Sequence, residues 1–290
     1  MLTTPSLAGS NAKSCQCSCG MTNGSPARLP QSPTLSRWLL ALLAVSTALV
    51  SPAAASSFET VWQDDFNGPP GRPDTTKWVY DVGSGNALWG NNEYQTYTSA
   101  MDNVRLDGAG HLLITARKEA DGRYTSGRIK TKGRFSQKYG RFEVQLKIPR
   151  GPGLLPAFWL MGNAGQWPAN GEIDVIENVG ESPNTVFANV HAPGYSSPGE
   201  HIADQALADG FHNYAIEWTP GRIQWFFDGK LFKTADAAKL QPGQAWVFDE
   251  QPFYMILNVA IGGDWPGQPV DSALPQSMII DWVKVMAYRP

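Results

Sequence analysis

Three acidic side chains lie within six residues of one short segment. Glu172, Asp174 and Glu177 are interspersed there with branched apolar residues, which favour a β-strand. Like charges this close on a strand disfavour each other, so a fold that keeps all three has a chemical use for them. The alternative is a solvated strand face on which acids alternate with apolar residues, and this segment alone leaves it open.

The spacing predicts that the three acids share one face only if the strand carries a β-bulge. Glu172 and Asp174 are two residues apart and therefore point the same way. Glu177 would point to the other face of a regular strand, and one extra residue at Val175-Ile176 would return it. The two glutamates would then be roughly 13 Å apart along the strand. Side chains that lean toward each other would reduce this to about 5–5.5 Å, the carboxyl separation of a retaining glycosidase.

Paired carboxyl groups at that separation are typical of glycoside hydrolysis through a covalent intermediate. One carboxylate attacks the anomeric carbon, while the other protonates the leaving oxygen and then deprotonates water. A third acid between them can hold a proton and donate a hydrogen bond to the nucleophile, which separates the pKa values of the pair.

The segments that would carry this strand are themselves strand-like. Residues 142–148 and 214–218 alternate apolar and polar side chains with a period of two. Asp228-Gly229 separates two apolar runs and predicts a hairpin, because both positions of such a tight turn need a positive φ. Asp121-Gly122 predicts a second hairpin, between residues 111–118 and 123–130, and residues 279–288 predict a last strand.

Composition supports the same class of fold. The 290 residues include 29 Gly and 22 Pro with only 17% charged residues, which favours turn-rich β structure and excludes a disordered chain. Amphipathic helices and a βαβ rhythm are both missing from the pattern. We therefore predict an all-β protein, a jelly-roll sandwich of two antiparallel sheets. The net charge of −3 argues against a nucleic-acid partner, which would require a basic face.

The first 55 residues differ from the rest of the chain. They contain three basic residues and no acidic ones, and an apolar run over residues 38–50 precedes Ala53 and Ala55. This pattern predicts a secretory signal peptide that is cleaved after Ala55, because the run is shorter than the roughly 20 residues of a membrane span. An uncleaved signal anchor is the alternative, and Met21 would make a more ordinary start of translation.

Cleavage there would leave residues 56–290 as one catalytic domain. All three cysteines, Cys15, Cys17 and Cys19, precede the apolar run, so the mature chain would contain no disulfide. Their C-x-C-x-C spacing is not a common zinc pattern. We expect a secreted monomer with no stable membrane association after cleavage.

The acidic segment resembles a known signature. Its E-I-D-V-I-E sequence is similar to that of glycoside hydrolase family 16, in the bulged form of laminarinase-type endo-β-1,3-glucanases. Further blocks of the chain resemble the family in the same order, so that the likeness extends over nearly all of residues 56–290. These blocks are residues 91–98, 124–129, 139–143, 156–159, 211–218 and 258–267. The resemblance implies a concanavalin-like jelly roll with a substrate cleft across its concave sheet.

The resemblance also implies roles for the acids and a class of substrate. Glu172 would be the nucleophile, Glu177 the acid/base, and Asp174 the assisting carboxyl group. The substrate would be a β-1,3-glucan such as laminarin, with mixed β-1,3/1,4-glucan as a second candidate. Hydrolysis of galactans and transglycosylation are alternatives within the family. A glucan-binding module without activity is another, although such modules typically lack the two glutamates that this chain keeps.

A glucan cleft needs aromatic platforms for sugar faces and polar groups for sugar hydroxyls. The resemblance places six further residues at such a cleft: Trp159, Trp167 and Trp265 as platforms, Asn91 and Arg128 at glucose hydroxyls, and His191 beside the leaving group. Trp89 is an additional candidate platform. A surface arginine and a structural histidine are the alternatives for Arg128 and His191.

The chemistry predicted here requires no cofactor, but the resemblance suggests a structural Ca2+ on the convex side. Asp281 matches the usual side-chain ligand and Gly110 would offer a carbonyl oxygen, the type of ligand that calcium prefers. The alternative for Asp281 is a solvated strand acid. One departure concerns Leu155, where many similar enzymes have Trp, and it places fine specificity in doubt.

Overall fold

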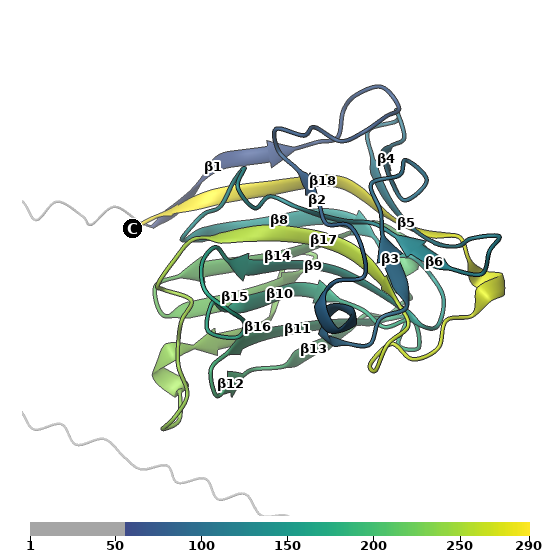
Figure 1. Cartoon of the computed structure of the whole chain (residues 1–290). Coiled ribbons are helices and arrows are strands. Elements are labelled where there is room, and N and C mark those ends of the chain that lie inside the picture. Colours follow the sequence, from purple (N-terminus) through teal and green to yellow (C-terminus); the bar gives the residue numbers. More distant parts are fainter. Residues whose placement is uncertain (1–55) are drawn as a thin grey trace, which may run out of the picture. The chain divides into compact units, whose positions relative to one another are not determined.

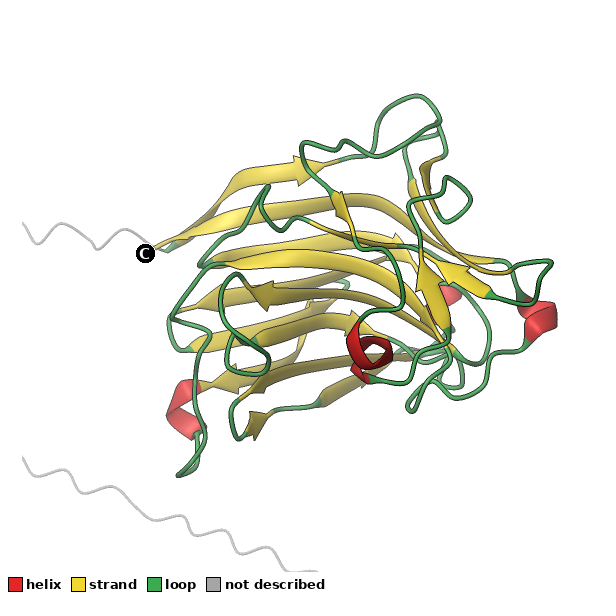
Figure 2. Ribbon diagram, in the orientation of Figure 1, coloured by secondary structure: helices red, strands yellow, loops and turns green. Residues whose placement is uncertain are grey.

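Two β-sheets stack face to face in the computed structural model, which describes residues 56–290 (Figure 1; Figure 2). The predicted signal peptide and all three cysteines lie outside the described residues. The prediction of a chain without amphipathic helices is confirmed for the described part, where only four short 3-10 helices occur. They are η1 Asn86–Gly90, η2 Leu207–Asp209, η3 Ala237–Lys239 and η4 Asp271–Ala273. No helix in this part is long and apolar enough to cross a membrane.

The larger sheet has its strands in the order β16-β15-β14-β8-β18-β5-β6-β3, with β1 beside β18 and β4 beside β5. Figure 1 shows β1 and β18 running side by side along one edge of the molecule, where the C-terminus lies. The bounds of these strands are β1 Ser57–Asp64, β3 Gln95–Tyr97, β4 Val104–Leu106, β5 Leu112–Lys118, β6 Tyr124–Ser126, β8 Gly140–Lys147, β14 His212–Thr219, β15 Arg222–Phe227, β16 Lys230–Asp236 and β18 Gln276–Arg289.

The smaller sheet has the order β12-β11-β10-β9-β17-β7-β2, with β13 beside β11. It contains the acidic segment as β10, two strands away from its edge strand β12. The bounds are β2 Val79–Tyr80, β7 Arg128–Lys130, β9 Leu154–Gly162, β10 Glu172–Glu177, β11 Thr185–Ala192, β12 Tyr195–Ser196, β13 Gly199–Ile202 and β17 Phe253–Ile261.

The core fills the space between the sheets, and the sequence pattern explains which strands face it. On β8 the side chains of Phe142, Val144 and Leu146 are fully buried, as their alternation with polar residues predicts. Strand β17 is buried along its whole length because it lies inside the smaller sheet and carries an almost unbroken apolar run. Trp78 and Trp225 are also fully buried, and each contributes about 1.5–3 kcal/mol or more through its apolar area.

The predicted Asp228-Gly229 hairpin is present between β15 and β16. Phe227 pairs with Lys230 across the turn, and the φ angles of Asp228 and Gly229 are 46° and 76°. Two consecutive positive φ angles define the type of turn whose twist matches a β-ribbon.

The prediction of one continuous strand over residues 123–130 is wrong. The chain breaks at Gly127, so that β6 joins the larger sheet and β7 joins the smaller one. A Cβ atom at Gly127 would lie 2.3 Å from Val104 Cγ2, so only glycine lets the chain pass between the sheets here. The expectation of purely antiparallel sheets also has one exception, because β3 pairs with β6 in parallel.

A lysine side chain is buried where β16 of the larger sheet contacts β13 of the smaller one. Lys233 on β16 lies beside Trp225 on β15, and its Nζ is 4.1 Å from the centre of the Trp225 ring. The same Nζ donates to Ser197 Oγ at 3.2 Å. Burial lowers the pKa of Lys233 to about 8, although the negative charge of Asp174 opposes this effect.

We predict that Lys233→Met removes a pH dependence of stability. Because the folded-state pKa of Lys233 lies below its unfolded value of about 10.4, burying the charged lysine costs stability below pH 8. That cost is relieved as the pH rises from about 8 to 10. The free energy of unfolding of the wild type, minus that of Lys233→Met, should therefore increase over this range in urea titrations.

The matched control is Lys230→Met, at an exposed position of the same strand. Its difference from the wild type should stay constant between pH 7 and 10. A constant difference for Lys233→Met as well would refute the prediction.

Candidate active site

The acidic strand β10 contains the predicted β-bulge. Asp174 pairs with Trp159 on β9, and Ile176 pairs with the adjacent residue, Phe158. Val175 therefore has no counterpart on β9 and is the extra residue of the bulge. The register with β11 shifts over the same stretch of β10.

The bulge places all three acids on one side of the smaller sheet. Glu172, Asp174 and Glu177 line the same cleft, which has a volume of about 610 Å3. Ile173 and Val175 are instead fully buried in the core between the sheets. The predicted β-bulge and the shared face of the three acids are thus confirmed.

Five of the six residues predicted at the substrate also line this cleft, and they come from separate parts of the chain. They are Asn91, Arg128, Trp159, Trp167 and Trp265. The sixth, His191, lies on β11 opposite Glu172, and its Nε2 is 3.4 Å from Asp174 Oδ2.

The predicted metal-site residues Asp281 and Gly110 are not among the residues that line the cleft. Leu155, at the position of the departure from the family pattern, does line it.

The surroundings of the three carboxyl groups separate their protonation states. Burial and the charges of Asp174 and Glu172 raise the pKa of Glu177 well above its usual range. Burial and the charge of Glu172 do the same to the pKa of Asp174. Burial also raises the pKa of Glu172, but His191 and hydrogen bonds from Asp174 and Trp167 oppose the rise. All three pKa values are thus raised, that of Glu172 less than those of its two neighbours, so Glu172 ionises most readily of the three.

Arg128 is held rigidly in the floor of the cleft. Its guanidinium lies 4.5 Å from the ring centre of Trp89 and 4.8 Å from that of Trp159. Its Nε donates to Asp81 Oδ2 at 3.0 Å. Because Arg128 occupies a face of Trp159, that ring is less available as a sugar platform than predicted. Trp167 and Trp265, which are 57% and 44% exposed, offer open aromatic surface.

A strained turn supports this arrangement from one side. In η1, Asn86–Gly90, the φ angles of Ala87, Leu88 and Trp89 are all between 48° and 58°. Such a run of left-handed residues costs of order 1–3 kcal/mol per residue, and it persists only where the surrounding structure imposes it. Here it places the Trp89 ring over Arg128 in the wall of the cleft.

The sequence patterns did not indicate Glu93 and Asn258, which also line the cleft. Gln95 Nε2 donates to Glu93 Oε2 at 2.5 Å, and burial raises the pKa of Glu93. Asn258 donates to the Tyr97 hydroxyl at 3.1 Å and accepts from Trp159 Nε1 at 2.8 Å. Both residues belong to blocks that resemble the family, and this was the only available signal.

Two loops at one end of the cleft are joined by hydrogen bonds. The Asp264 backbone N–H donates to the Asn91 carbonyl at 2.9 Å, and Tyr94 N–H donates to the Ile261 carbonyl at 2.8 Å. Asn92 Nδ2 donates to both carboxylate oxygens of Asp264 at 3.0 Å. These contacts connect the loop that carries Asn91 to the loop that carries Trp265. Trp265 also packs edge-on against Phe187, with ring centres 5.2 Å apart.

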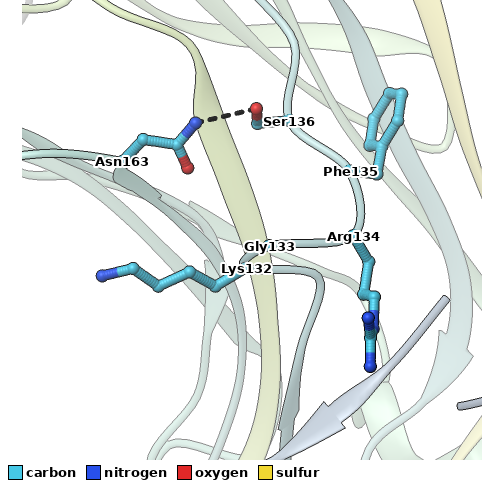
Figure 3. Close-up of a pocket in the computed structure, with 6 residues that line it drawn as sticks. All are labelled: Lys132, Gly133, Arg134, Phe135, Ser136 and Asn163. Carbon is cyan, nitrogen blue, oxygen red and sulfur yellow. Dashed lines mark hydrogen bonds between the residues drawn. The ribbon is translucent and has the colours of Figure 1, made fainter. Parts of the chain in front are cut away.

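A second hollow of about 570 Å3 lies elsewhere on the surface and lacks comparable chemistry (Figure 3). It is lined by residues 132–136 and Asn163, and it contains no carboxyl group. Figure 3 shows the Lys132 and Arg134 side chains pointing in different directions, while Asn163 donates to Ser136. The candidate active site is therefore the cleft with the three acids.

Comparison with known proteins identifies the class to which this fold and site belong. The sequence profile of glycosyl hydrolases family 16 matches residues 90–284. A β-glucanase of Rhodothermus marinus is 42% identical over 250 residues, which cover 80% of this chain and 86% of that protein. The chain belongs to glycosyl hydrolases family 16 and is a glycoside hydrolase.

Solved structures of relatives have the same fold. The crystal structure of the laminarinase from Rhodothermus marinus matches 81% of this chain and 99% of its own, with a TM-score of 0.75 and 39% identity. A variant of SCLam, a non-specific endo-β-1,3(4)-glucanase co-crystallised with a glucan oligosaccharide, matches with a TM-score of 0.73 and 36% identity. That match covers 82% of this chain and 97% of the other. The predicted jelly-roll sandwich is confirmed.

We predict that the hydrogen bond between Asn92 and Asp264 keeps the Trp265 loop closed. Asn92→Asp would place two carboxylates against each other and remove a bond of about 1.5–3 kcal/mol. Backbone amides of residues 262–267 should then exchange about tenfold faster or more in hydrogen-exchange measurements.

The exchanged pair, Asn92→Asp with Asp264→Asn, recreates an amide–carboxylate contact and serves as the control. It should restore slow exchange in this loop. Equally fast exchange in the single and the double variant would show that the contact does not hold the loop.

Proposed function

We propose that this protein is a retaining endo-β-1,3-glucanase that hydrolyses laminarin-like glucans. The observation that carries the proposal is the bulged strand, which presents Glu172, Asp174 and Glu177 together in one cleft. The names of its relatives, a β-glucanase and laminarinases, favour this substrate class over galactans.

Glu172 is assigned the nucleophile because its pKa is raised less than those of Asp174 and Glu177, so it ionises more readily than they do. Its carboxylate attacks the anomeric carbon from one face of the sugar, and a covalent glycosyl-enzyme results. Asp174 donates a hydrogen bond to Glu172 and so keeps the two carboxyl groups from repelling each other.

Glu177 is assigned the acid/base because burial and two neighbouring acids favour its protonated form. It protonates the leaving oxygen in the first step and takes a proton from water in the second. His191, beside Glu172 and Asp174, is assigned to the leaving-group side.

The remaining cleft residues are assigned to the glucan itself. Trp167 and Trp265 present open rings, on which the apolar faces of glucose units can stack. Asn91 and Arg128 supply hydrogen bonds to sugar hydroxyls, and Trp159 contributes the surface that Arg128 leaves free. Arg128 donates from a fixed position, which lowers the entropic cost of binding.

We predict that Glu172→Gln and Glu177→Gln each lower kcat on laminarin by about a thousandfold or more, because each removes an essential chemical step. Reducing-end assays measure the loss, and near-wild-type thermal unfolding shows that the fold persists. Proton NMR of early products should show the β-anomer first, as retention requires. Activity within tenfold of the wild type in either variant, or early release of the α-anomer, would contradict the mechanism.

The substrate class is tested by the same assay on laminarin, lichenan, agarose and carrageenan. Laminarin should be the preferred substrate. Mixed-linkage glucanase activity is the second candidate, supported by the likeness to SCLam, and it predicts comparable rates on lichenan. Activity confined to agarose or carrageenan would replace the proposal, and binding of laminarin without hydrolysis would identify a recognition module.

We also propose a structural Ca2+ away from the cleft, held by Asp281 and Gly110. Ile280 on β18 pairs with Leu112 on β5, which places Asp281 and Gly110 near the same end of that strand pair. Asp281 falls at the register shift between β18 and β8, outside the regular ladder. The amide oxygen of Asn67 lies close to Gly110. A set of oxygen atoms alone suits a hard cation such as Ca2+.

We predict that EDTA lowers the Tm of the wild type by about 5–10 °C, because a ligand at 100 times its Kd stabilises a fold by about 2.7 kcal/mol. Calcium should restore the Tm. In Asp281→Ala neither EDTA nor calcium should change it, while kcat on laminarin at 25 °C should be unchanged. An EDTA response of the same size in Asp281→Ala would place the ion elsewhere.

For residues 1–55 we propose removal as a signal peptide and secretion of residues 56–290. The support is the sequence pattern of a basic segment, an apolar run and an Ala-x-Ala site. N-terminal sequencing of the exported protein should begin at Ser56.

A further inference from the structure

We propose that Glu172, Asp174 and His191 form a binding site for Zn2+, and that an ion bound there blocks the enzyme. The binding site stands on the geometry of these three side chains alone. Only the inhibition rests on the proposed function.

Two neighbouring strands bring the three ligand atoms together. Glu172 and Asp174 lie on β10, and His191 lies directly opposite Glu172 on β11. His191 Nε2 is 3.4 Å from Asp174 Oδ2 and 3.9 Å from Glu172 Oε1, and all three ligand atoms lie within 4.8 Å of one another. Zinc ligands sit about 2.0–2.2 Å from the ion, so small side-chain rotations would complete the site.

An independent observation is that one ligand oxygen of the proposed zinc site has no hydrogen-bond partner. Asp174 Oδ2 is buried and accepts no hydrogen bond among the described residues, and the Asp174 side chain is only 3% exposed. A buried oxygen without a partner is unfavourable, and a cation beside it would remove that cost.

The hydrogen bonds of Asn189 fix the tautomer of neutral His191. Asn189 Oδ1 accepts from Val190 N–H at 2.8 Å and from Ser196 Oγ at 3.2 Å, which turns the amide Nδ2 toward His191 Nε2 at 3.1 Å. Nε2 is therefore the acceptor in neutral His191, with its proton on Nδ1. A nitrogen in this state can bind a metal ion without first losing a proton, and the ion would replace the hydrogen bond from Asn189 Nδ2.

The ligand set selects the class of metal. One imidazole nitrogen and two carboxylate oxygens suit Zn2+, whereas Ca2+ prefers six to eight oxygen atoms. Binding of Zn2+ would release to water the proton that Asp174 shares with Glu172. Glu172 is partly exposed to the cleft, so water can occupy a fourth position, as in open zinc sites. An ion there would engage the lone pairs with which Glu172 attacks the sugar, and it would occupy the space of the reacting glucose unit.

The binding test is calorimetric titration of EDTA-treated, calcium-reloaded enzyme with ZnCl2. We expect one Zn2+ per chain in the wild type, and a Kd at least tenfold weaker in His191→Gln. The matched control is His212→Gln, which alters a histidine paired with Asp228 outside the cleft and should leave the Kd unchanged. Equal Zn2+ affinity in His191→Gln and the wild type would overturn the site.

The inhibition test is steady-state hydrolysis of laminarin at several ZnCl2 concentrations. We expect inhibition that is competitive with laminarin, and an inhibition constant at least tenfold higher in whatever activity His191→Gln retains. Noncompetitive inhibition, or equal inhibition constants, would overturn the blocking role. If the enzyme does not hydrolyse laminarin at all, the proposed function is wrong. The zinc site is still tested in that case, because calorimetry measures Zn2+ binding without any enzyme activity.

Discussion

One extra residue in β10, Val175, determines what this protein can do. In a regular strand, Glu177 would point between the sheets and place a carboxyl group in an apolar core. The cost of burying an unpaired charge there would far exceed that of a local break in strand pairing. The bulge resolves the conflict, because it keeps the branched residues in the core and turns the glutamate back to the cleft. The neighbouring strands then only have to accept a shift of register.

Three acids on one face create a second problem, which is their mutual repulsion. The site reduces it through protonation and position rather than through a direct ion pair with a cation. Asp174 is almost fully buried and shares a hydrogen bond with Glu172. His191 lies opposite Glu172 on β11, and its Nε2 is 3.4 Å from Asp174 Oδ2. Arg128 lies farther along the cleft, where Asp81 balances its charge and two tryptophan rings enclose it. The resulting field distinguishes two chemically identical glutamates.

The larger sheet also contributes to the site, although it contains none of the acids. Trp225 on β15 donates from its indole nitrogen to the backbone carbonyl of Asp174 at 2.7 Å, and Lys233 Nζ lies over the same ring. The Asp174 carbonyl beside the bulge is thereby satisfied from inside the core. The larger sheet thus supports the acidic strand from the core. The loops of Asn92 and Asp264, joined by hydrogen bonds, support the cleft at one end.

The sequence by itself determined what depends on neighbours along the chain: the alternation of β8, the Asp228-Gly229 turn, the acidic strand and its bulge. Resemblance to a family added five cleft residues from distant segments. Only the tertiary structure decided the break at Gly127, the enclosure of Arg128, and the contacts of Glu93 and Asn258. These depend on contacts between residues that are distant in the sequence. Gly127 packs closely against Val104, for example, and Asn258 donates a hydrogen bond to Tyr97. The local sequence pattern does not predict such contacts, because they arise from how the two sheets pack against each other.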